Sequence, residues 1–152
     1  MTHDSESLSN QPTQLTELQS GAALFIWTLR QWVSAARAKV CIHTALDERY
    51  RAESCPDGVA LADELFCILS AAAIRPVNIL CHHANYISPD EERLVLVLQA
   101  LERKELEKAQ AELTSIISWP LNRTFCRTAN EYVKSINQAK LSCVGIRKLR
   151  VV

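Results

Sequence analysis

The chain has 152 residues, and its 17 basic and 17 acidic side chains leave no net formal charge. This length fits one domain with a sizeable core, and 48% hydrophobic and 22% charged residues are typical of a globular protein. The chain has only 3 Gly and 5 Pro. So few turn-forming residues argue against a sandwich or barrel of many short strands, because such folds need many turns, and the composition favours long helices instead.

The N-terminal part predicts a polar tail followed by a long helix. Residues 1–13 have almost nothing to bury, so we expect a disordered tail, with residues 14–152 forming a single helical domain. From about Gln14 to Lys39, apolar residues recur at spacings of three and four, as on the buried face of a helix. Leu24 and Trp27 lie off that stripe. They indicate either a helix buried on two sides, which we prefer, or a contact surface for a second protein.

Two shorter helices and one irregular segment follow. The first is expected from Thr44 to about Glu53, where Thr44 and Asp47 have the spacing of a capping box. After a turn at residues 54–58, the second runs to about Ala73, and Pro76 prevents its continuation. Residues 75–86 do not have a helical pattern. At most, we expect a minor two-stranded pairing between residues 77–81 and the strand-like C-terminal tail, residues 144–152.

The central helix is expected to begin at the motif Ser88-Pro89-Asp90-Glu91. Ser88 can cap the free amides, Pro89 suits the first helical position, and Glu91 can reach back to the cap. Five consecutive apolar residues, 94–98, cover every side of this helix, so we expect other helices around it. The apolar pattern then slips by one residue near residues 103–105. This slip predicts a helical hairpin, with one long helix over residues 89–118 as the alternative. A last helix begins near Pro120. The expected fold is therefore an all-α bundle of five or six helices.

The common catalytic and nucleotide-binding motifs are missing from the sequence. The three glycines lie far apart, which excludes a P-loop and a dinucleotide fingerprint. There is also no zinc-protease helix, nucleophile elbow, C-x-x-C pair or EF-hand loop. We recognise no signal peptide and no apolar run long enough to span a bilayer. We therefore expect a cytoplasmic protein with no membrane partner. In that compartment, the six cysteines are expected to be reduced thiols.

Two Cys-x-His pairs provide the most specific chemical signal. Cys41 and His43, like Cys81 and His83, are two residues apart, and in extended backbone such residues point to the same side. Together they could supply a Cys2His2 set for tetrahedral zinc. However, 37 residues separate the pairs, and structural zinc pairs usually have wider internal spacing. The other interpretation is small apolar thiols beside hydrogen-bonded loop histidines. Zinc is thus the one cofactor that the sequence raises.

A further cysteine lies in a basic surrounding. Cys126 is placed between Arg123 and Arg127 near the start of the last helix, where cations and the helix dipole would favour a thiolate. We prefer the other interpretation, an inert cysteine on the flank of the buried stripe, because free cysteines are usually buried.

The C-terminal part is basic. From residue 123 onward, there are seven Lys and Arg residues and one acidic residue, Glu131. Such an end could meet nucleic acid, an acidic lipid surface or an acidic partner, but we prefer a solvated helix face with a charged tail. No aromatic residue is interleaved among Arg147, Lys148 and Arg150, so nucleic acid is not an expected partner.

These observations favour a non-enzymatic interaction or regulatory module whose partner is another protein or a second copy of this chain. Its candidate contacts are Leu24, Trp27 and the basic C-terminal residues Arg147, Lys148 and Arg150. One alternative is a small zinc-binding protein that uses the two Cys-x-His pairs. Another is an enzyme of unrecognised type, with its site in the polar loop at residues 81–85.

Overall fold

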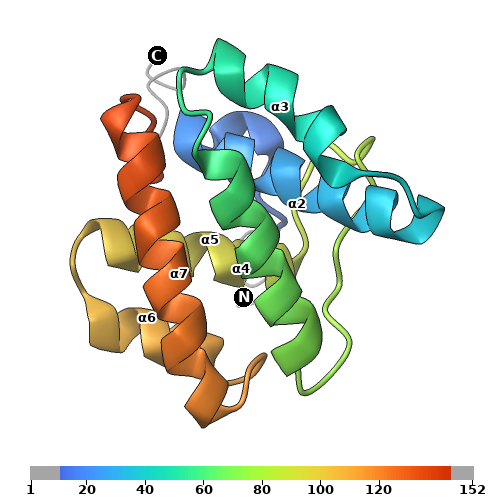
Figure 1. Ribbon diagram of the computed structural model, residues 1–152. Coiled ribbons are helices and arrows are strands. Elements are labelled where there is room, and N and C mark those ends of the chain that lie inside the picture. The colour runs from blue at the N-terminus through green and yellow to red at the C-terminus, as the bar shows by residue number, and fades with distance from the viewer. Residues whose placement is uncertain (1–10, 145–152) are drawn as a thin grey trace, which may run out of the picture.

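A computed structural model describes residues 11–144, and this part of the chain contains six α-helices and no β-strand (Figure 1). The predicted all-α fold is confirmed. A short 3-10 helix, η1 (Leu15–Glu17), precedes the α-helices, which are α2 (Ser20–Ala38), α3 (Ile42–Ala52), α4 (Gly58–Ala72), α5 (Pro89–Glu102), α6 (Leu106–Leu113) and α7 (Trp119–Gln138). Most of the predicted tail, and the C-terminal half of the predicted strand pairing, lie outside the described residues. Residues 77–81 carry no regular secondary structure.

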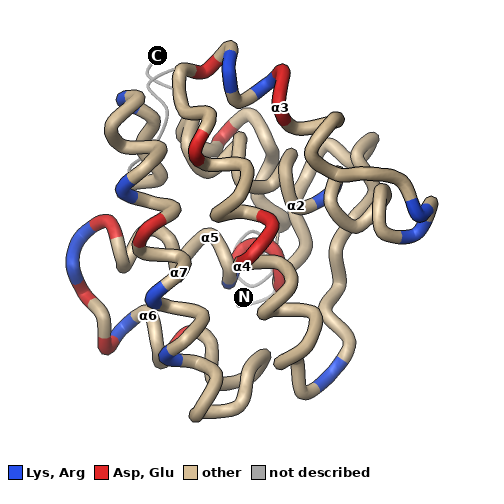
Figure 2. Tube along the Cα trace, viewed as in Figure 1, with Lys and Arg blue, Asp and Glu red and all other residues tan. Residues whose placement is uncertain are grey.

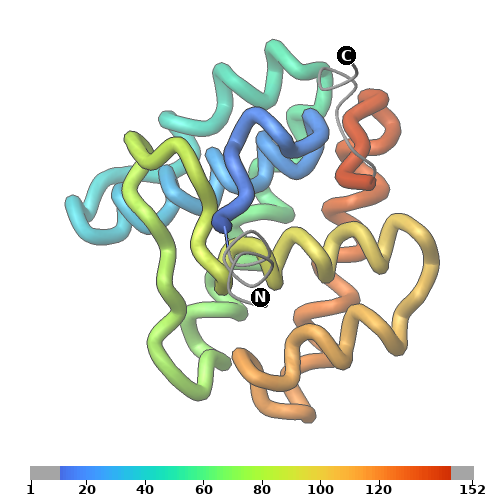
Figure 3. Tube along the Cα trace, turned by 180° about the vertical axis from the view of Figure 1, so that it is seen from behind, coloured from blue at the N-terminus to red at the C-terminus, as the bar shows by residue number. Residues whose placement is uncertain are grey.

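The helices pack around one hydrophobic core. Helices α4 and α7 lie side by side, and α5 forms a hairpin with α6 that packs against α7 (Figures 1 and 3). Helix α2 contacts α3, α4 and α5, so it closes the other side of the core. The core combines the apolar faces of all six helices, including the aromatic side chains Phe25, Phe66 and Phe125. None of the helices in residues 11–144 is both long and apolar enough to cross a membrane.

The central helix α5 begins as its sequence predicts. The Ser88 hydroxyl accepts a hydrogen bond from the Glu91 amide at 3.0 Å, and the Glu91 carboxylate accepts one from the Ser88 amide at 2.9 Å. This reciprocal capping box satisfies two backbone donors at the start of the helix. Among the apolar residues 94–98, all except Leu96 are buried. Contacts of α5 with α2, α6 and α7 explain this burial on nearly every side.

A tight turn after α5 confirms the predicted hairpin. Helix α5 ends at Glu102, and Lys104 adopts a left-handed backbone with φ of 63° before α6 begins at Leu106. Glycine is the residue that usually takes this conformation. A lysine takes it here, which explains why the sequence carried no glycine signal for the turn.

Two helix starts differ from their predictions. The first predicted helix is interrupted at Leu18, whose backbone is extended, and α2 starts only at Ser20. Before η1, the chain pairs with a distant segment: the Leu15 amide donates to the Asn85 carbonyl at 2.8 Å, and the Ile87 amide donates to the Thr13 carbonyl at 2.9 Å. Helix α3 starts at Ile42 with Cys41 as its N-cap, so the predicted capping box at Thr44 and Asp47 is wrong.

Leu24 and Trp27 belong to the packed interior side of α2. Leu24 is 1% exposed, and Trp27 is half-buried against the core with the Arg49 guanidinium 4.8 Å from its ring centre. The interpretation of α2 as a helix buried on two sides therefore holds. As a correction to the alternative, Leu24 offers no surface to a partner in the folded domain.

A buried ion pair fixes the long irregular segment, residues 73–88, to the core. The Arg30 guanidinium forms two bonds of 2.9 Å with the Glu91 carboxylate, and it also donates to the carbonyls of Ala84 and Tyr86. The same carboxylate accepts a hydrogen bond from the Leu80 amide at 3.2 Å. Because both charges are buried and every bond is short, this cluster holds the two ends of the 80–86 turn in place.

Candidate functional site

A basic groove between α6 and α7 is the strongest candidate site. We call it the α6–α7 groove. It has a volume of about 460 Å³, within the range of ligand-binding clefts. Four of its lining residues are cationic and none is acidic; the lining consists of Leu101, Lys104, Leu106, Gln110, Arg123, Cys126, Arg127, Asn130 and Lys134.

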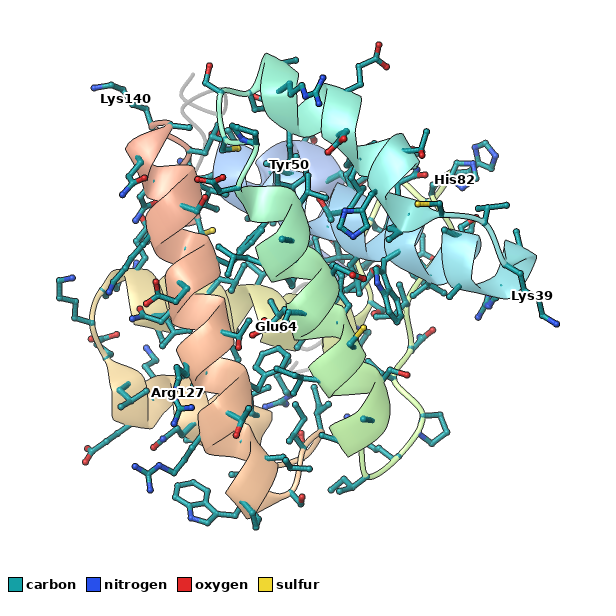
Figure 4. All side chains as sticks on the ribbon, viewed as in Figure 1. Lys39, Tyr50, Glu64, His82, Arg127 and Lys140 are labelled. Atoms are coloured by element: carbon teal, nitrogen blue, oxygen red, sulfur yellow. The ribbon has the colours of Figure 1, made fainter. Side chains whose placement is uncertain are left out.

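One wall of the groove is a single face of α7. Arg123, Arg127, Asn130 and Lys134 follow one another at spacings of four, three and four, so they lie in one row along the helix. The opposite face carries the core residues of α7, which fixes the rotation of the helix and turns this row outward. Figure 4 shows Arg127 on the flank of α7 that lies next to α6.

The other wall comes from the α5–α6 hairpin. Near the start of α7, the Asn122 side chain donates to the Gln110 carbonyl of α6 at 2.9 Å, so Gln110 lies near the Arg123 end of the groove. At the end of α5, the Glu102 carboxylate accepts a hydrogen bond from the Cys143 amide at 2.9 Å, in the segment that follows α7. Leu101 and the turn that carries Lys104 and Leu106 therefore lie toward the Lys134 end. The left-handed turn at Lys104 brings this lysine to the rim.

The cations of the groove are poorly neutralised. Within residues 11–144, Lys104, Arg123 and Arg127 form no ion pair, and Lys134 approaches Glu131 only at 3.5 Å, in an exposed pair. Figure 2 shows Lys and Arg residues along this flank of α7. In the adjacent α5–α6 turn, by contrast, basic and acidic residues are mixed. The charged residues that line the groove itself are all cations, and such a concentration of one sign of charge in a cleft attracts anions.

Cys126 lies in the inner lining of the groove as a neutral thiol. It is 2% exposed, and burial raises the pKa of its thiol to about 11. Its sulfur atom lies 3.7 Å from the Asn122 side-chain oxygen. The preferred interpretation, an inert buried cysteine, describes this residue. Desolvation outweighs the neighbouring cations, so the thiolate that they would favour is not formed near neutral pH.

The Cys-x-His residues are not gathered into one site. Among the described residues, no three His, Cys, Asp or Glu side chains are grouped so that they could hold a metal ion. Cys41 is exposed at the start of α3, where bonds from the Thr44 and His43 amides lower the pKa of its thiol. The His43 imidazole lies 3.3 Å from the Asp63 carboxylate. Zinc binding by Cys41, His43, Cys81 and His83 stays a prediction, which elemental analysis of the purified protein tests.

The polar loop at residues 81–85 is exposed and held by the buried ion pair. Cys81 and His82 line a shallow hollow of about 390 Å³ that also includes Arg37 of α2. The rings of His82 and His83 lie 4.1 Å apart, measured between their centres. In this part of the structure, no hydrogen bond connects the Cys81 thiol with an imidazole. The loop therefore presents no nucleophile–base pair of the kind that activates a cysteine.

The groove was only partly predictable. The basic character of the last helix pointed to Arg123, Arg127 and Lys134, and their helical spacing would have placed them in one row. The sequence gives no sign that Lys104 and Leu106 face this row, because that depends on how the hairpin packs. The predicted contacts Arg147, Lys148 and Arg150 lie outside the described residues. In comparisons with protein-family models, curated proteins and solved structures, the chain matched none of them.

Proposed function

We propose that this domain is a non-enzymatic interaction module that binds an acidic segment of another protein in the α6–α7 groove. The observation that carries the proposal is the convergence of Lys104, Arg123 and Arg127 on one groove in which no carboxylate neutralises them. Clusters of arginine are a recurring means of recognising acidic motifs, because guanidinium groups bind carboxylates in a bidentate manner.

The lining of the groove favours a protein segment over nucleic acid. No aromatic side chain lines it, so it has no platform on which bases could stack. The basic row from Arg123 to Lys134 spans about 16 Å, given the rise of 1.5 Å per residue. An extended peptide of about five residues covers this length. Leu101 and Leu106 add apolar surface, which a peptide side chain can contact and a phosphate backbone cannot.

The chemistry of the groove also supports binding over catalysis. Its polar groups are four cations and two amides, which suit recognition of carboxylates. Its only other ionisable group is the Cys126 thiol, whose raised pKa keeps it protonated near neutral pH. Activated nucleophiles have the opposite shift.

The proposal is tested by fluorescence anisotropy with a labelled peptide of alternating Asp, Glu and Leu residues. Arg123→Glu combined with Arg127→Glu should weaken binding about tenfold or more, because each reversal replaces an attraction by a repulsion. The matched control reverses Arg37 and Arg51, two exposed cations on α2 and α3 that do not line the groove. Circular dichroism verifies that both variants fold. Equal losses in the two variants would show that the peptide responds only to overall charge.

A second copy of this chain is the competing partner. Light scattering over a range of concentrations distinguishes the two cases. If the domain dimerises and the groove variant is monomeric, the acidic segment belongs to this chain. If the domain is monomeric and still binds the peptide, the partner is another protein.

A further inference from the structure

We infer that the segment bound in the α6–α7 groove is bipartite, with carboxylates at the Arg123–Arg127 end and one apolar side chain at the Leu101–Leu106 end. This inference rests on the proposed function and specifies the chemistry of the partner. It follows from the different composition of the two ends of the groove.

The first end is polar. Arg123 and Arg127 are one helical turn apart, which places their side chains as neighbours on the surface of α7. Gln110 of α6 also lines the groove, and its backbone carbonyl accepts a hydrogen bond from Asn122, the residue before Arg123. Two guanidinium groups and one amide provide several donors and no anionic acceptor, so this end suits carboxylates.

The second end combines apolar surface with two lysines, Lys104 and Lys134. Leu106 is the first residue of α6, lines the groove and is 51% exposed. Leu101 lines the same groove and is almost fully buried. An exposed leucine is unusual within a turn whose other members, residues 103–105, 107 and 108, are all charged. An incoming aliphatic side chain would remove the exposed surface of Leu106 from water, which purely acidic residues cannot do.

The spacing of the two ends gives the spacing of the motif. Arg127 and Lys134 are two helical turns apart, which is about 10 Å along α7. In an extended peptide, this distance corresponds to about three residues. The favoured segment therefore carries two acidic residues at alternate positions, which point to the same side of an extended peptide, and a Leu, Ile or Phe about three positions beyond them.

Other exposed apolar residues do not share this arrangement. Val40, Ile74, Tyr86 and Trp119 are also exposed, but none of them lines the α6–α7 groove. Leu106 is thus the one large exposed apolar side chain among the groove residues. The residues directly beside Leu106 carry mixed charges, so the complementarity to an acidic segment comes from the four cations that line the groove.

The test compares three synthetic peptides by fluorescence anisotropy. The first contains two Glu residues and one Leu at this spacing, the second has Ser in place of the Leu, and the third has Gln in place of both Glu residues. We expect the change of Leu to Ser to weaken binding by about tenfold, the equivalent of losing one buried leucine contact. The change of Glu to Gln should abolish measurable binding.

Variants of the protein test whether Leu106 is the residue that the leucine of the peptide contacts. Leu106→Ser should remove the difference between the Leu and Ser peptides, since each then meets a polar surface. Leu106→Gln repeats the test with a longer side chain. Leu96→Ser is the control, because Leu96 is an exposed leucine of α5 that does not line the groove. Leu96→Ser should leave the difference between the peptides unchanged.

The possible failures are distinguishable. If the Leu and Ser peptides bind equally while the Arg123 and Arg127 reversals still weaken both, the bipartite inference is overturned and the proposed function stands. If no acidic peptide binds, or the arginine reversals have no effect, the proposed function itself is refuted. A Leu-dependent difference that persists in Leu106→Ser would place the apolar contact elsewhere and overturn the inference.

Discussion

The substitution Glu91→Gln should destabilise the domain strongly. It keeps the size of the side chain but removes the charge that faces Arg30. Both side chains are almost completely buried, at 0% and 2% exposure of Glu91 and Arg30 respectively. Removing one partner of a buried ion pair costs about 3–5 kcal/mol, because the remaining charge stays in a medium that solvates it poorly. A domain of this size has a free energy of unfolding of about 5–15 kcal/mol, so this loss is a large share.

The assay is urea unfolding followed by circular dichroism. With a urea dependence of about 1–3 kcal/mol per molar, the unfolding midpoint should fall by about 2 M. The control is Glu53→Gln, which breaks a partly exposed pair between the residue that follows α3 and Arg49, four residues earlier in α3. Such pairs contribute less than about 1 kcal/mol. If Glu91→Gln costs no more than the control, the reasoning about the buried pair is wrong.

The same variant should loosen the irregular segment before it unfolds the core. The amides of Leu80 and Ser88 donate to the Glu91 carboxylate, so they should exchange their hydrogens faster than the amides in the middle of α5. Replacing Arg30 and Glu91 together by Met and Leu should recover only part of the loss. The double change removes the unpaired charge, but the carbonyls of Ala84 and Tyr86 also lose their donor.

Three further predictions concern the core and are measured by the same unfolding assay. Tyr50→Phe should lower the free energy of unfolding by about 1–3 kcal/mol, because it leaves the buried Tyr132 hydroxyl without its described partner, 2.7 Å away. Tyr132→Phe should lower it by only about 1 kcal/mol, because the Tyr50 hydroxyl keeps its hydrogen bond to a buried threonine. Equal losses in the two variants would contradict this difference between the two hydroxyl groups. Gly21→Ala should cost about 1–3 kcal/mol, because the added carbon would lie 2.8 Å from the backbone after α7, and a neutral effect would refute that close approach. Burial raises the pKa of the Cys126 thiol from 9.0 to about 11, so the folded state holds this proton more tightly than the unfolded chain does. The resulting contribution to stability is fully present below pH 9 and is lost as the pH rises from 9 to 11. Cys126→Ser should therefore show a shallower loss of stability over this pH window, and an unchanged slope would contradict the raised pKa.

Local signals in the sequence predicted much of the fold. The motif from Ser88 to Glu91 predicted the start of α5, because capping depends on residues within one turn. The one-residue slip in the apolar pattern predicted the turn at Lys104, although no glycine marks it. Both features depend on neighbours in sequence, so a pattern could reveal them.

Features that depend on packing were less accessible. The start of α2 was misplaced because the Leu15 amide pairs with a residue 70 positions away, at Asn85. The burial of Leu24 follows from contacts of α2 with three other helices, which a single stripe on one helix does not reveal. The α6–α7 groove likewise needs the hairpin to lie against α7. The sequence indicated its arginines, but not the lysine and leucine that face them.

The most direct test of the account is a heteronuclear NMR titration of the folded domain with the peptide that carries two Glu residues and one Leu. The account predicts that amide shifts change in α6, in α7 between Arg123 and Lys134, and at Lys104, and that these changes disappear when Arg123 and Arg127 are reversed. Changes confined to the loop at residues 81–85, or to α2 and α3, would contradict it, as would the absence of any change at millimolar peptide.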